Sequence, residues 1–455
     1  MKDTIAAIST PQAPGGLGVL RISGEDACKT ADKVFTGVSG KSLAEYKGYT
    51  AGYGIVNDEK CEKIDDAVAL VFRAPKSYTG EDTVEISCHG GMYVMHTLLD
   101  AVIKAGARIA EPGEFTKRAF LNGKMDLTQA ESVMQIIHAG GEQAAKEAVS
   151  ASEGSLSKKL FSIRGSLTNL MAHLAAWADF PEEDVPQVEE RELIIELAKI
   201  QQSLSSLVES YSRGQVFREG VTAVIAGKTN AGKSTLMNLL SGCEKSIVTH
   251  IPGTTRDVVE DTISLAGVPV RIADTAGIRD TDDVVEKIGV EKSWKRMENA
   301  GLVIAVFDSS VNLDKNDEKL ISRLNPQNTI AVINKTDLKP AISADIIKEK
   351  FPHIVQISAQ AGEGLSELET AVSNIFKTQD FDPHAGTLYT KRQESDAADA
   401  AEKINEAVSA LEYGMTLDAV TVCIEEALNA LYRLTGEKVS DEVVNQVFDR
   451  FCVGK

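Results

Sequence analysis

The chain has no apolar run near the length of about twenty residues that a membrane-spanning helix requires. Its start, Met1 to Ile8, lacks the charged and then apolar build of a signal peptide. The six cysteines include no CxxC pair, so neither a zinc site nor a disulfide framework is indicated. We therefore expect a cytoplasmic protein with reduced thiols and no membrane contact.

Basic residues are scarce as well. Lys and Arg number 48 against 67 Asp and Glu, which gives a formal net charge of −19. This balance disfavours general binding to nucleic acid through phosphate neutralisation, so any RNA contact must be local or shared with a partner. The length of 455 residues predicts about three domains.

One short segment is far more specific than the composition. Residues 227–234 read GKTNAGKS, which fits the phosphate-loop pattern GxxxxGKS. The β-branched apolar run Val221 to Ala226 precedes it and the helix-forming run Ser234 to Leu240 follows, which favours a phosphate loop over a plain Gly-rich turn. In such a loop backbone N–H groups wrap the phosphates, Lys233 reaches the β- and γ-phosphate oxygens, and the Ser234 hydroxyl ligates Mg²⁺. The nucleotide-binding residues expected here are Asn230, Ala231, Gly232, Lys233, Ser234 and Thr235.

Three later segments, in the order found in GTPases, make the prediction specific for guanine. Asp274 follows an apolar strand, where it can hold Mg²⁺ through water while the Gly277 N–H senses the γ-phosphate. Asp337 follows another buried strand and can accept hydrogen bonds from the guanine N1–H and 2-amino group, a donor pair that adenine lacks. The residues assigned to GTP are Asp274, Thr275, Ala276 and Gly277, then Asn334, Lys335 and Asp337, and finally Ser358, Ala359 and Gln360.

Residues 249–257, reading THIPGTTRD, have the composition of a switch loop that closes over the nucleotide, with an ordinary hairpin loop as the alternative. Thr255 is the expected second hydroxyl ligand of Mg²⁺. The GTP contacts assigned to this loop are Thr249, His250, Ile251, Pro252, Gly253, Thr254 and Thr255.

The position after DTAG holds Ile278, where many small GTPases place a glutamine that orients the attacking water. An apolar side chain cannot orient water, so another group must do so, and the acidic stretch Asp280 to Glu286 offers candidates. Charge on the transferring phosphoryl group must also be offset from elsewhere, by an arginine finger or a cation.

The pattern along the chain predicts a combined α/β, α and α+β architecture. Residues 215–378 alternate strand and helix, as in a Ras-like P-loop GTPase domain, with an antiparallel hairpin turning at Ala266-Gly267. The flanking segments 121–214 and 379–455 have helical apolar spacing, the first opened by a capping box from Thr128 to Glu131. We therefore expect a G domain inserted into a discontinuous helical domain, preceded by an α+β domain over residues 1–120. In that domain Pro14 to Gly18 lacks GxGxxG and is assigned to a turn.

Four further motifs lie outside the GTPase pattern: LRISG at 20–24, YTGEDTVE at 78–85, PGEF at 112–115, and the tail FCVGK at 451–455. In this order, across the whole chain, they resemble the MnmE family, also called TrmE, of tRNA modification GTPases. The resemblance implies a homodimer formed through the N-terminal domains and a complex with the FAD-containing partner MnmG, or GidA. Together such proteins add a carboxymethylaminomethyl or aminomethyl group to carbon-5 of the wobble uridine of certain tRNAs.

The resemblance also implies a reduced folate, 5,10-methylenetetrahydrofolate, as the one-carbon donor, with 5-formyltetrahydrofolate as its analogue. The residues that match the folate contacts of the family are Arg21, Glu85, Lys124 and Lys455. A glutamate can pair with the aminopyrimidinone N–H groups, and cations can pair with the glutamate carboxylates of folate. Cys452 matches a tail cysteine suspected of taking part in the chemistry, and Val453 replaces the more usual isoleucine.

The same resemblance accounts for the missing glutamine. The family resembles GTPases that are activated when their G domains dimerise in the presence of K⁺. The K⁺ ligands implied here are the Asn230 side chain and the carbonyls of Thr249, Ile251 and Thr254. Glu286 matches the glutamate that orients water indirectly, so the catalytic residues expected are Glu286, Lys233 and Cys452.

Two other functions remain open at this point. A K⁺-dependent ribosome-assembly GTPase shares this type of phosphate loop, but we would expect it to carry a more basic RNA-binding appendage. A folate-binding module with a vestigial GTPase is disfavoured because every nucleotide motif is intact.

Overall fold

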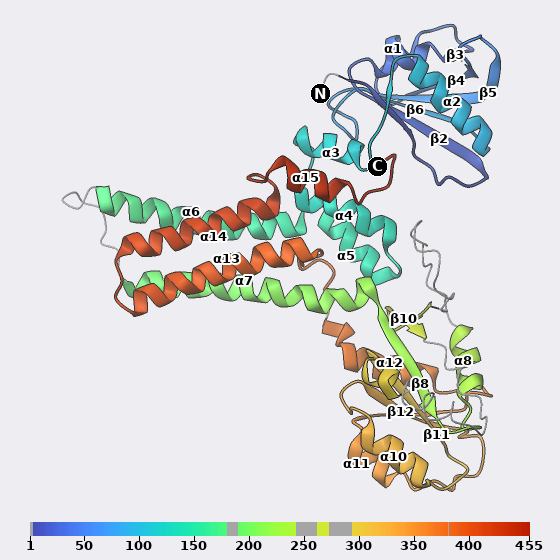
Figure 1. Cartoon of the computed structure of the whole chain (residues 1–455), viewed down its shortest axis with the longest axis vertical. Helices are drawn as coiled ribbons and strands as arrows, with labels where there is room; N and C mark the ends of the chain where they lie inside the picture. Colours follow the sequence, from blue (N-terminus) through green and yellow to red (C-terminus); the bar gives the residue numbers. More distant parts are fainter. Residues whose placement is uncertain (1–2, 180–189, 243–261, 273–293, 381) are drawn as a thin grey trace. The chain divides into compact units, whose positions relative to one another are not determined.

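The structure is a computed structural model that describes residues 3–179, 190–242, 262–272, 294–380 and 382–455 (Figure 1). The chain divides into two compact units. The N-terminal unit combines Met1–Met134 with Thr421–Lys455, and the second unit is Gln135–Val420. Among the described helices, none has both the length and the apolar composition needed to cross a bilayer.

The N-terminal unit is built on a sheet with the strand order β3-β4-β5-β6-β2-β1-β7. Its neighbouring strands are antiparallel except for the pair β1 and β7. The strands are β1 (Ile5–Ile8), β2 (Gly15–Ser23), β3 (Phe35–Gly37), β4 (Thr50–Asn57), β5 (Lys63–Phe72), β6 (Thr83–Gly90) and β7 (Arg108–Ile109). The helices around it are α1 (Ala27–Asp32), η1 (Leu43–Glu45), α2 (Met92–Lys104), α3 (Glu114–Leu121), α4 (Leu127–His138) and α15 (Asp441–Phe448).

One face of this sheet forms an apolar core with α1 and α2. Successive side chains along a strand point to opposite faces of the sheet, which produces this apolar face. On β5, Ala67, Ala69 and Val71 are buried, while Val68 is exposed. α3 and α15 pack together beside the sheet, and Phe448 anchors a smaller cluster there. The expected α+β architecture of this region is confirmed.

Two local predictions in this unit are wrong. Pro14 to Gly18 is not a turn, because β2 already begins at Gly15, and a register irregularity between Gly15 and Gly18 absorbs the glycines. The capping box lies two residues earlier than expected. The Asp126 carboxylate accepts from the Gln129 N–H at 2.9 Å, and the Gln129 side chain accepts from the Asp126 N–H at 3.1 Å.

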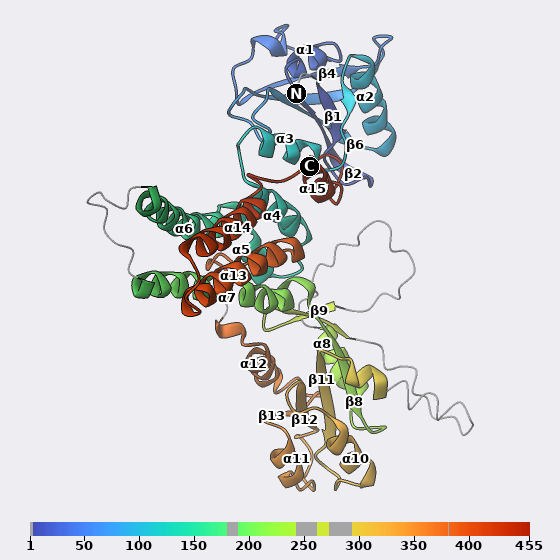
Figure 2. The same ribbon diagram turned by 60° about the vertical axis from the view of Figure 1, so that its left-hand side comes forward.

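The second unit contains a helical layer and an α/β domain. The helices of the layer are α5 (Glu142–Ser152), α6 (Ser155–Asp179), α7 (Glu190–Glu219) and α13 (Lys391–Glu412), and α14 (Leu417–Thr435) follows them in the chain. α13 runs beside α7 in both views (Figure 1 and Figure 2). Buried residues recur every three or four positions on both helices, from Leu193 to Leu207 on α7 and from Ala397 to Leu411 on α13. These stripes hold together two helices that lie on either side of the G domain in sequence.

The α/β domain has the strand order β13-β12-β11-β8-β10-β9, with β9 antiparallel to β10 and the other neighbours parallel. Its strands are β8 (Val221–Gly227), β9 (Thr262–Leu265), β10 (Val268–Ile272), β11 (Leu302–Asp308), β12 (Thr329–Asn334) and β13 (His353–Ile357). Its helices are α8 (Lys233–Ser241), α10 (Lys315–Arg323), α11 (Asp345–Lys350), α12 (Leu365–Phe376) and the short η2 (Thr378–Asp380).

Helices cover both faces of this sheet, as a doubly wound fold requires. α8 and α12 share one core with the strands, and α10 and α11 share the other. The β9–β10 hairpin turns at Ala266 and Gly267, both with positive φ, as the sequence predicts. The predicted class, a P-loop α/β domain inserted into a discontinuous helical domain, is confirmed.

Candidate functional site

The phosphate loop lies where β8 ends and α8 begins. Gly227 and Gly232 have φ of 147° and 96°, values that a residue with a side chain rarely adopts. A Cβ on Gly232 would lie 2.1 Å from the Asn334 side-chain nitrogen. The Lys233 ammonium donates to the carbonyls of Gly227 and Lys228 at 2.7 and 2.6 Å, so it closes the loop on itself. The strand and the helix thus hold the loop backbone in a phosphate-binding form.

The base-recognition segments lie at the same edge of the sheet. Asn334 is buried at the end of β12 and links two loops: its side-chain nitrogen donates to the Ala231 carbonyl at 3.0 Å, and its oxygen accepts from the Ala359 N–H at 3.0 Å. The Ser358 hydroxyl donates to the Asp337 carboxylate at 2.6 Å. The carboxylate that is expected to read guanine is therefore held by a buried serine from the next strand.

Lys335 contacts a residue that sequence reasoning missed. Its ammonium lies 2.5 Å from the Asp308 carboxylate at the end of β11. Burial raises the pKa of Asp308, but the hydrogen bonds from Lys335 and Ser310 and the charge of Lys335 together outweigh it, and the net shift is downward. Asp308 follows a buried strand, as Asn334 does, and that position was the available signal.

The side chain of Lys228 in the phosphate loop also forms ion pairs. Its ammonium lies 2.7 Å from Asp314 and 2.5 Å from Asp317, which cap the start of α10. These two carboxylates offset the charge of a lysine that does not contact phosphate in the pattern GxxxxGKS.

The remaining predicted residues of the nucleotide site fall into two groups. Asn230 and Gln360 are exposed in loops, and Ser234 and Thr235 are exposed in the first turn of α8. Outside the described residues lie Thr249, His250, Ile251, Pro252, Gly253, Thr254, Thr255, Asp274, Thr275, Ala276, Gly277 and Glu286. The described part of the site fits a guanine nucleotide: the glycines at positive φ shape the loop between β8 and α8, Lys233 lies at that loop, and the exposed Ser234 hydroxyl is available for Mg²⁺.

A second group of predicted residues meets in the N-terminal unit. Arg21 of β2 and Glu85 of β6 are cross-strand neighbours, with Arg21 Nη2 2.8 Å from the Glu85 carboxylate. The Arg21 guanidinium also lies 5.5 Å from the ring centroids of Tyr78 and Phe115. Residues of LRISG, YTGEDTVE and PGEF are therefore assembled around one cation, and we call this the Arg21 site.

The chain terminus joins this site. Gly454 has φ of 94°, and a Cβ there would lie 2.5 Å from the Ile8 carbonyl oxygen, so only glycine fits. The Ser9 hydroxyl donates to the Gly454 carbonyl at 3.2 Å. Burial and the charge of Arg21 lower the pKa of Lys455, while Glu85 opposes that shift. An anionic ligand would relieve the repulsion between these two cations.

Of the two other predicted residues, Lys124 has no described contact with Arg21, Glu85 or Lys455, whereas the Cys452 carbonyl accepts from the Lys455 N–H at 3.3 Å. Lys124 donates to the Pro75 carbonyl at 3.0 Å, and its side chain passes over Gly80. Cys452 is exposed in the tail, and its carbonyl accepts from the Gly113 N–H at 3.4 Å. The structure thus brings together Arg21, Glu85 and Lys455.

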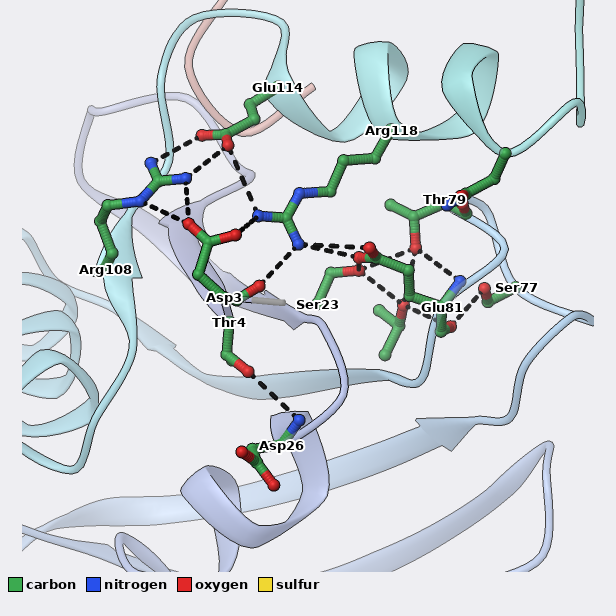
Figure 3. Close-up of polar contacts among 12 residues, drawn as sticks. Asp3, Thr4, Ser23, Asp26, Ser77, Thr79, Glu81, Arg108, Glu114 and Arg118 are labelled. Carbon is green, nitrogen blue, oxygen red and sulfur yellow. Dashed lines mark hydrogen bonds and ion pairs between the residues drawn. The ribbon is translucent and has the colours of Figure 1, made fainter. Parts of the chain in front are cut away.

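An ion-pair network joins α3 to the N-terminal segment and to the YTGEDTVE loop (Figure 3). Arg118 of α3 is 1% exposed and pairs with Asp3 at 2.9 Å and with Glu81 at 3.0 Å. Arg108 pairs with the same Asp3 and with Glu114 (Figure 3). The network fixes α3, which carries Phe115 of the Arg21 site, to the YTGEDTVE loop. Sequence reasoning missed Arg118, because its partners lie far apart in the chain.

A second support is more direct. The Tyr78 hydroxyl and the buried Thr116 hydroxyl lie 2.9 Å apart. Thr116 follows Phe115 on α3, so the two rings that flank Arg21 are held by adjacent residues of one helix.

The doubly wound fold and its phosphate loop define the class of protein: a P-loop GTPase with two additional regions. Both regions match family models, the GTP-binding protein TrmE N-terminus over residues 4–124 and the MnmE helical domain over residues 127–452. The chain belongs to the MnmE family.

Three curated relatives, each described as "tRNA modification GTPase MnmE", match along the whole chain. The protein of Acetivibrio thermocellus is 43% identical, covering 100% of this chain and 99% of the relative. That of Carboxydothermus hydrogenoformans is 42% identical and covers 100% of both. That of Clostridioides difficile is 41% identical, covering 100% of this chain and 99% of the relative.

Proposed function

We propose that this GTPase acts in tRNA modification together with the FAD-containing partner MnmG, or GidA, at the wobble uridine of certain tRNAs. The group added to carbon-5 is carboxymethylaminomethyl or aminomethyl, and a reduced folate bound at the Arg21 site supplies the one-carbon unit. The proposal places the work in the cytoplasm, where tRNA is found. Because the family match covers the N-terminal and helical regions as well as the G domain, it favours tRNA modification over ribosome assembly.

The proposal divides the chain by task. Residues 1–120 bind folate and form the homodimer, and residues 215–378 hydrolyse GTP. Segments 121–214 and 379–455 together form the helical domain. The N-terminal assignment is supported by one observation above others: Arg21, Glu85 and Lys455, from distant parts of the sequence, meet at one site. A carboxylate beside two cations suits a ligand that has both amidine-like N–H donors and carboxylates.

GTP hydrolysis on this proposal needs both Mg²⁺ and K⁺. Ser234 and Thr255 hold Mg²⁺, and Asn230 with the carbonyls of Thr249, Ile251 and Thr254 holds K⁺ when two G domains meet. K⁺ offsets the charge that develops between the β- and γ-phosphates. Asn230 supports this assignment, because it is exposed in the phosphate loop and its side-chain oxygen is of the type that binds K⁺.

Folate binding is tested by calorimetric titration of 5-formyltetrahydrofolate into the full-length protein, an Arg21→Ala variant and a chain ending at Phe451. We expect saturable binding by the full-length protein that both changes abolish. Absence of binding by the full-length protein would remove the folate assignment and leave the GTPase of this family with another one-carbon source.

The K⁺ and water-orienting assignments have their own test. GTP turnover is measured in KCl and in NaCl for the unmodified protein, Asn230→Ala and Glu286→Ala. We expect turnover by the unmodified protein to require K⁺. Asn230→Ala should lose the stimulation by K⁺ and stay at a low rate in both salts. Glu286→Ala should bind GTP normally while losing turnover. Equal rates in both salts would overturn the K⁺ site.

A further inference from the structure

The chain passes between the helical layer and the G domain twice, and the two passages share one buried residue. It leaves through Gly220, between α7 and β8, and returns through residues 382–390 to α13. Arg218 lies just before the first passage, and Thr387 lies in the second. Both donate to the carboxylate of Glu147, which belongs to α5.

The contacts of Glu147 are short and enclosed. Glu147 is 0% exposed; Arg218 Nη1 donates to its carboxylate at 3.1 Å and Thr387 Oγ1 at 2.5 Å. The Tyr389 hydroxyl donates to the Glu147 backbone carbonyl at 3.0 Å. The Arg218 guanidinium also lies 5.3 Å from the ring centroid of Tyr211 and 5.7 Å from that of Tyr389.

Burial raises the pKa of Glu147, and the charge of Arg218 opposes that rise. A buried carboxylate that loses such a partner is destabilised strongly, so neither passage can move away from α5 without a large cost. Glu147 therefore ties the two passages to each other.

The start of the same helix touches the β9–β10 hairpin. A Cβ on Gly267, at the hairpin turn, would lie 3.2 Å from Gln143 Cγ on α5. A Cβ on Gly220 would lie 2.4 Å from the Pro269 carbonyl oxygen on β10. The hairpin thus lies close to both α5 and the first passage. In sequence it stands between the expected switch loop, residues 249–257, and Asp274.

We propose that Glu147 is a positioning residue that joins α5, Arg218 and Thr387 into a coupling element through which the GTPase switches act on the helical layer. A change of bound nucleotide shifts the hairpin, α5 follows the hairpin, and the buried ion pair carries α5 and both passages together. Close packing transmits such a shift because the contacts cannot deform gradually. The inference rests on the proposed use of GTP hydrolysis in tRNA modification.

The test uses the full chain with spin labels on noncanonical amino acids at exposed positions Ser203 on α7 and Glu349 on α11. Distances between the two labels are measured in KCl, once with GDP and once with GDP plus aluminium fluoride. The proteins compared are the unmodified protein, Glu147→Gln and a matched control, Glu153→Gln. Glu153 is an exposed glutamate at the C-cap of the same helix. We expect a distance change between nucleotide states that Glu147→Gln loses and Glu153→Gln keeps.

Activity provides the second readout, with tRNA and the partner present. We expect Glu147→Gln to hydrolyse GTP within about twofold of the unmodified protein, while the number of tRNAs modified per GTP falls about tenfold, within the usual range of coupling between sites. A general loss of folding would lower both. If Glu147→Gln does not fold, Thr387→Val, which removes the hydroxyl that donates to Glu147, takes its place, and we expect the same direction of effect.

Each outcome is decisive. An unmodified protein whose distance is the same in both nucleotide states overturns the coupling element, as does a distance change that survives in Glu147→Gln. In a third outcome, the distance change is lost only in Glu147→Gln, but the unmodified protein does not modify tRNA. That result would support the coupling element and contradict the proposed function.

Discussion

The nucleotide site and the Arg21 site are built in opposite ways. The first depends on backbone: one continuous loop between β8 and α8 shapes the phosphate cradle, and nearby strand ends supply its supports. The second depends on side chains from separate strands, with Lys455 brought in by the tail. A backbone site tolerates change at most positions and fails at a few, whereas a side-chain site is sensitive at each contributor.

Among the substitutions that separate the two sites, Lys233→Ala has the largest expected effect, which is on GTP hydrolysis. Lys233 is the cation of the phosphate loop, so we expect kcat/KM for GTP hydrolysis to fall roughly 10²–10³-fold, as when one charge-stabilising donor is removed. Folate affinity, measured by calorimetry on the same sample, should stay unchanged. Hydrolysis within tenfold of the unmodified protein would contradict the role given to Lys233.

Asp337→Asn should change the choice of base. The carboxylate held by Ser358 is expected to accept from two guanine donors, and hydrogen bonds to a charged group contribute about 1.5–3 kcal/mol, so we expect GTP affinity to fall roughly 10²-fold. Xanthosine triphosphate, which has a carbonyl in place of the 2-amino group, should gain affinity. The exposed Glu349→Gln is the control, and equal losses for both nucleotides would point to damage to the fold.

Gly454→Ala tests whether the tail completes the Arg21 site. The added methyl group would meet the Ile8 carbonyl, and the positive φ adds strain, together costing about 1–3 kcal/mol. We expect 5-formyltetrahydrofolate affinity to fall about tenfold while GTP turnover is unchanged. Val453→Ala, at an exposed neighbour, should leave both unaltered; unchanged folate affinity in Gly454→Ala would show that binding does not need the docked tail.

Ser358→Ala should have a smaller effect. It removes the hydrogen bond that positions Asp337 but leaves the carboxylate itself in place, so we expect GTP affinity, measured by competition with a fluorescent GDP analogue, to fall only about fivefold. Ser366→Ala, on the exposed surface of α12, is the control. A loss as large as that of Asp337→Asn would mean that Ser358 contacts the base itself.

The smallest expected effect is on pH dependence. Burial and Arg21 lower the pKa of Lys455, and bound carboxylates would raise it, so the complex holds more protons than the free protein. Affinity is therefore full below the lowered pKa of Lys455 and declines by about two- to threefold as pH rises through it, in a range below the ordinary lysine value of 10.5. Lys455→Gln removes this part of the profile; an identical profile in both would exclude Lys455.

The difference between the sites also explains why the nucleotide loop can be predicted from the sequence pattern and the other contacts cannot. GKTNAGKS places its glycines, lysine and serine within eight residues, and strand ends mark Asn334 and Asp337, so local pattern suffices for the nucleotide loop. Arg118 and Glu147 carry no such pattern, since their partners come from distant segments and only packing brings them together. The capping box at Asp126 was misplaced because Thr128 and Glu131 offer the same pattern two residues later. Family resemblance, rather than spacing, identified Arg21, Glu85 and Lys455.

The insertion of the G domain into the helical domain has a consequence for synthesis. α7 packs on α13, but the whole G domain lies between them in the chain. At about 5–20 residues per second, a ribosome spends on the order of ten seconds on the intervening segment. During that time the G domain can fold, while the apolar stripe of α7 has no α13 to pack on, so the nascent helical domain exposes apolar surface that chaperones can bind.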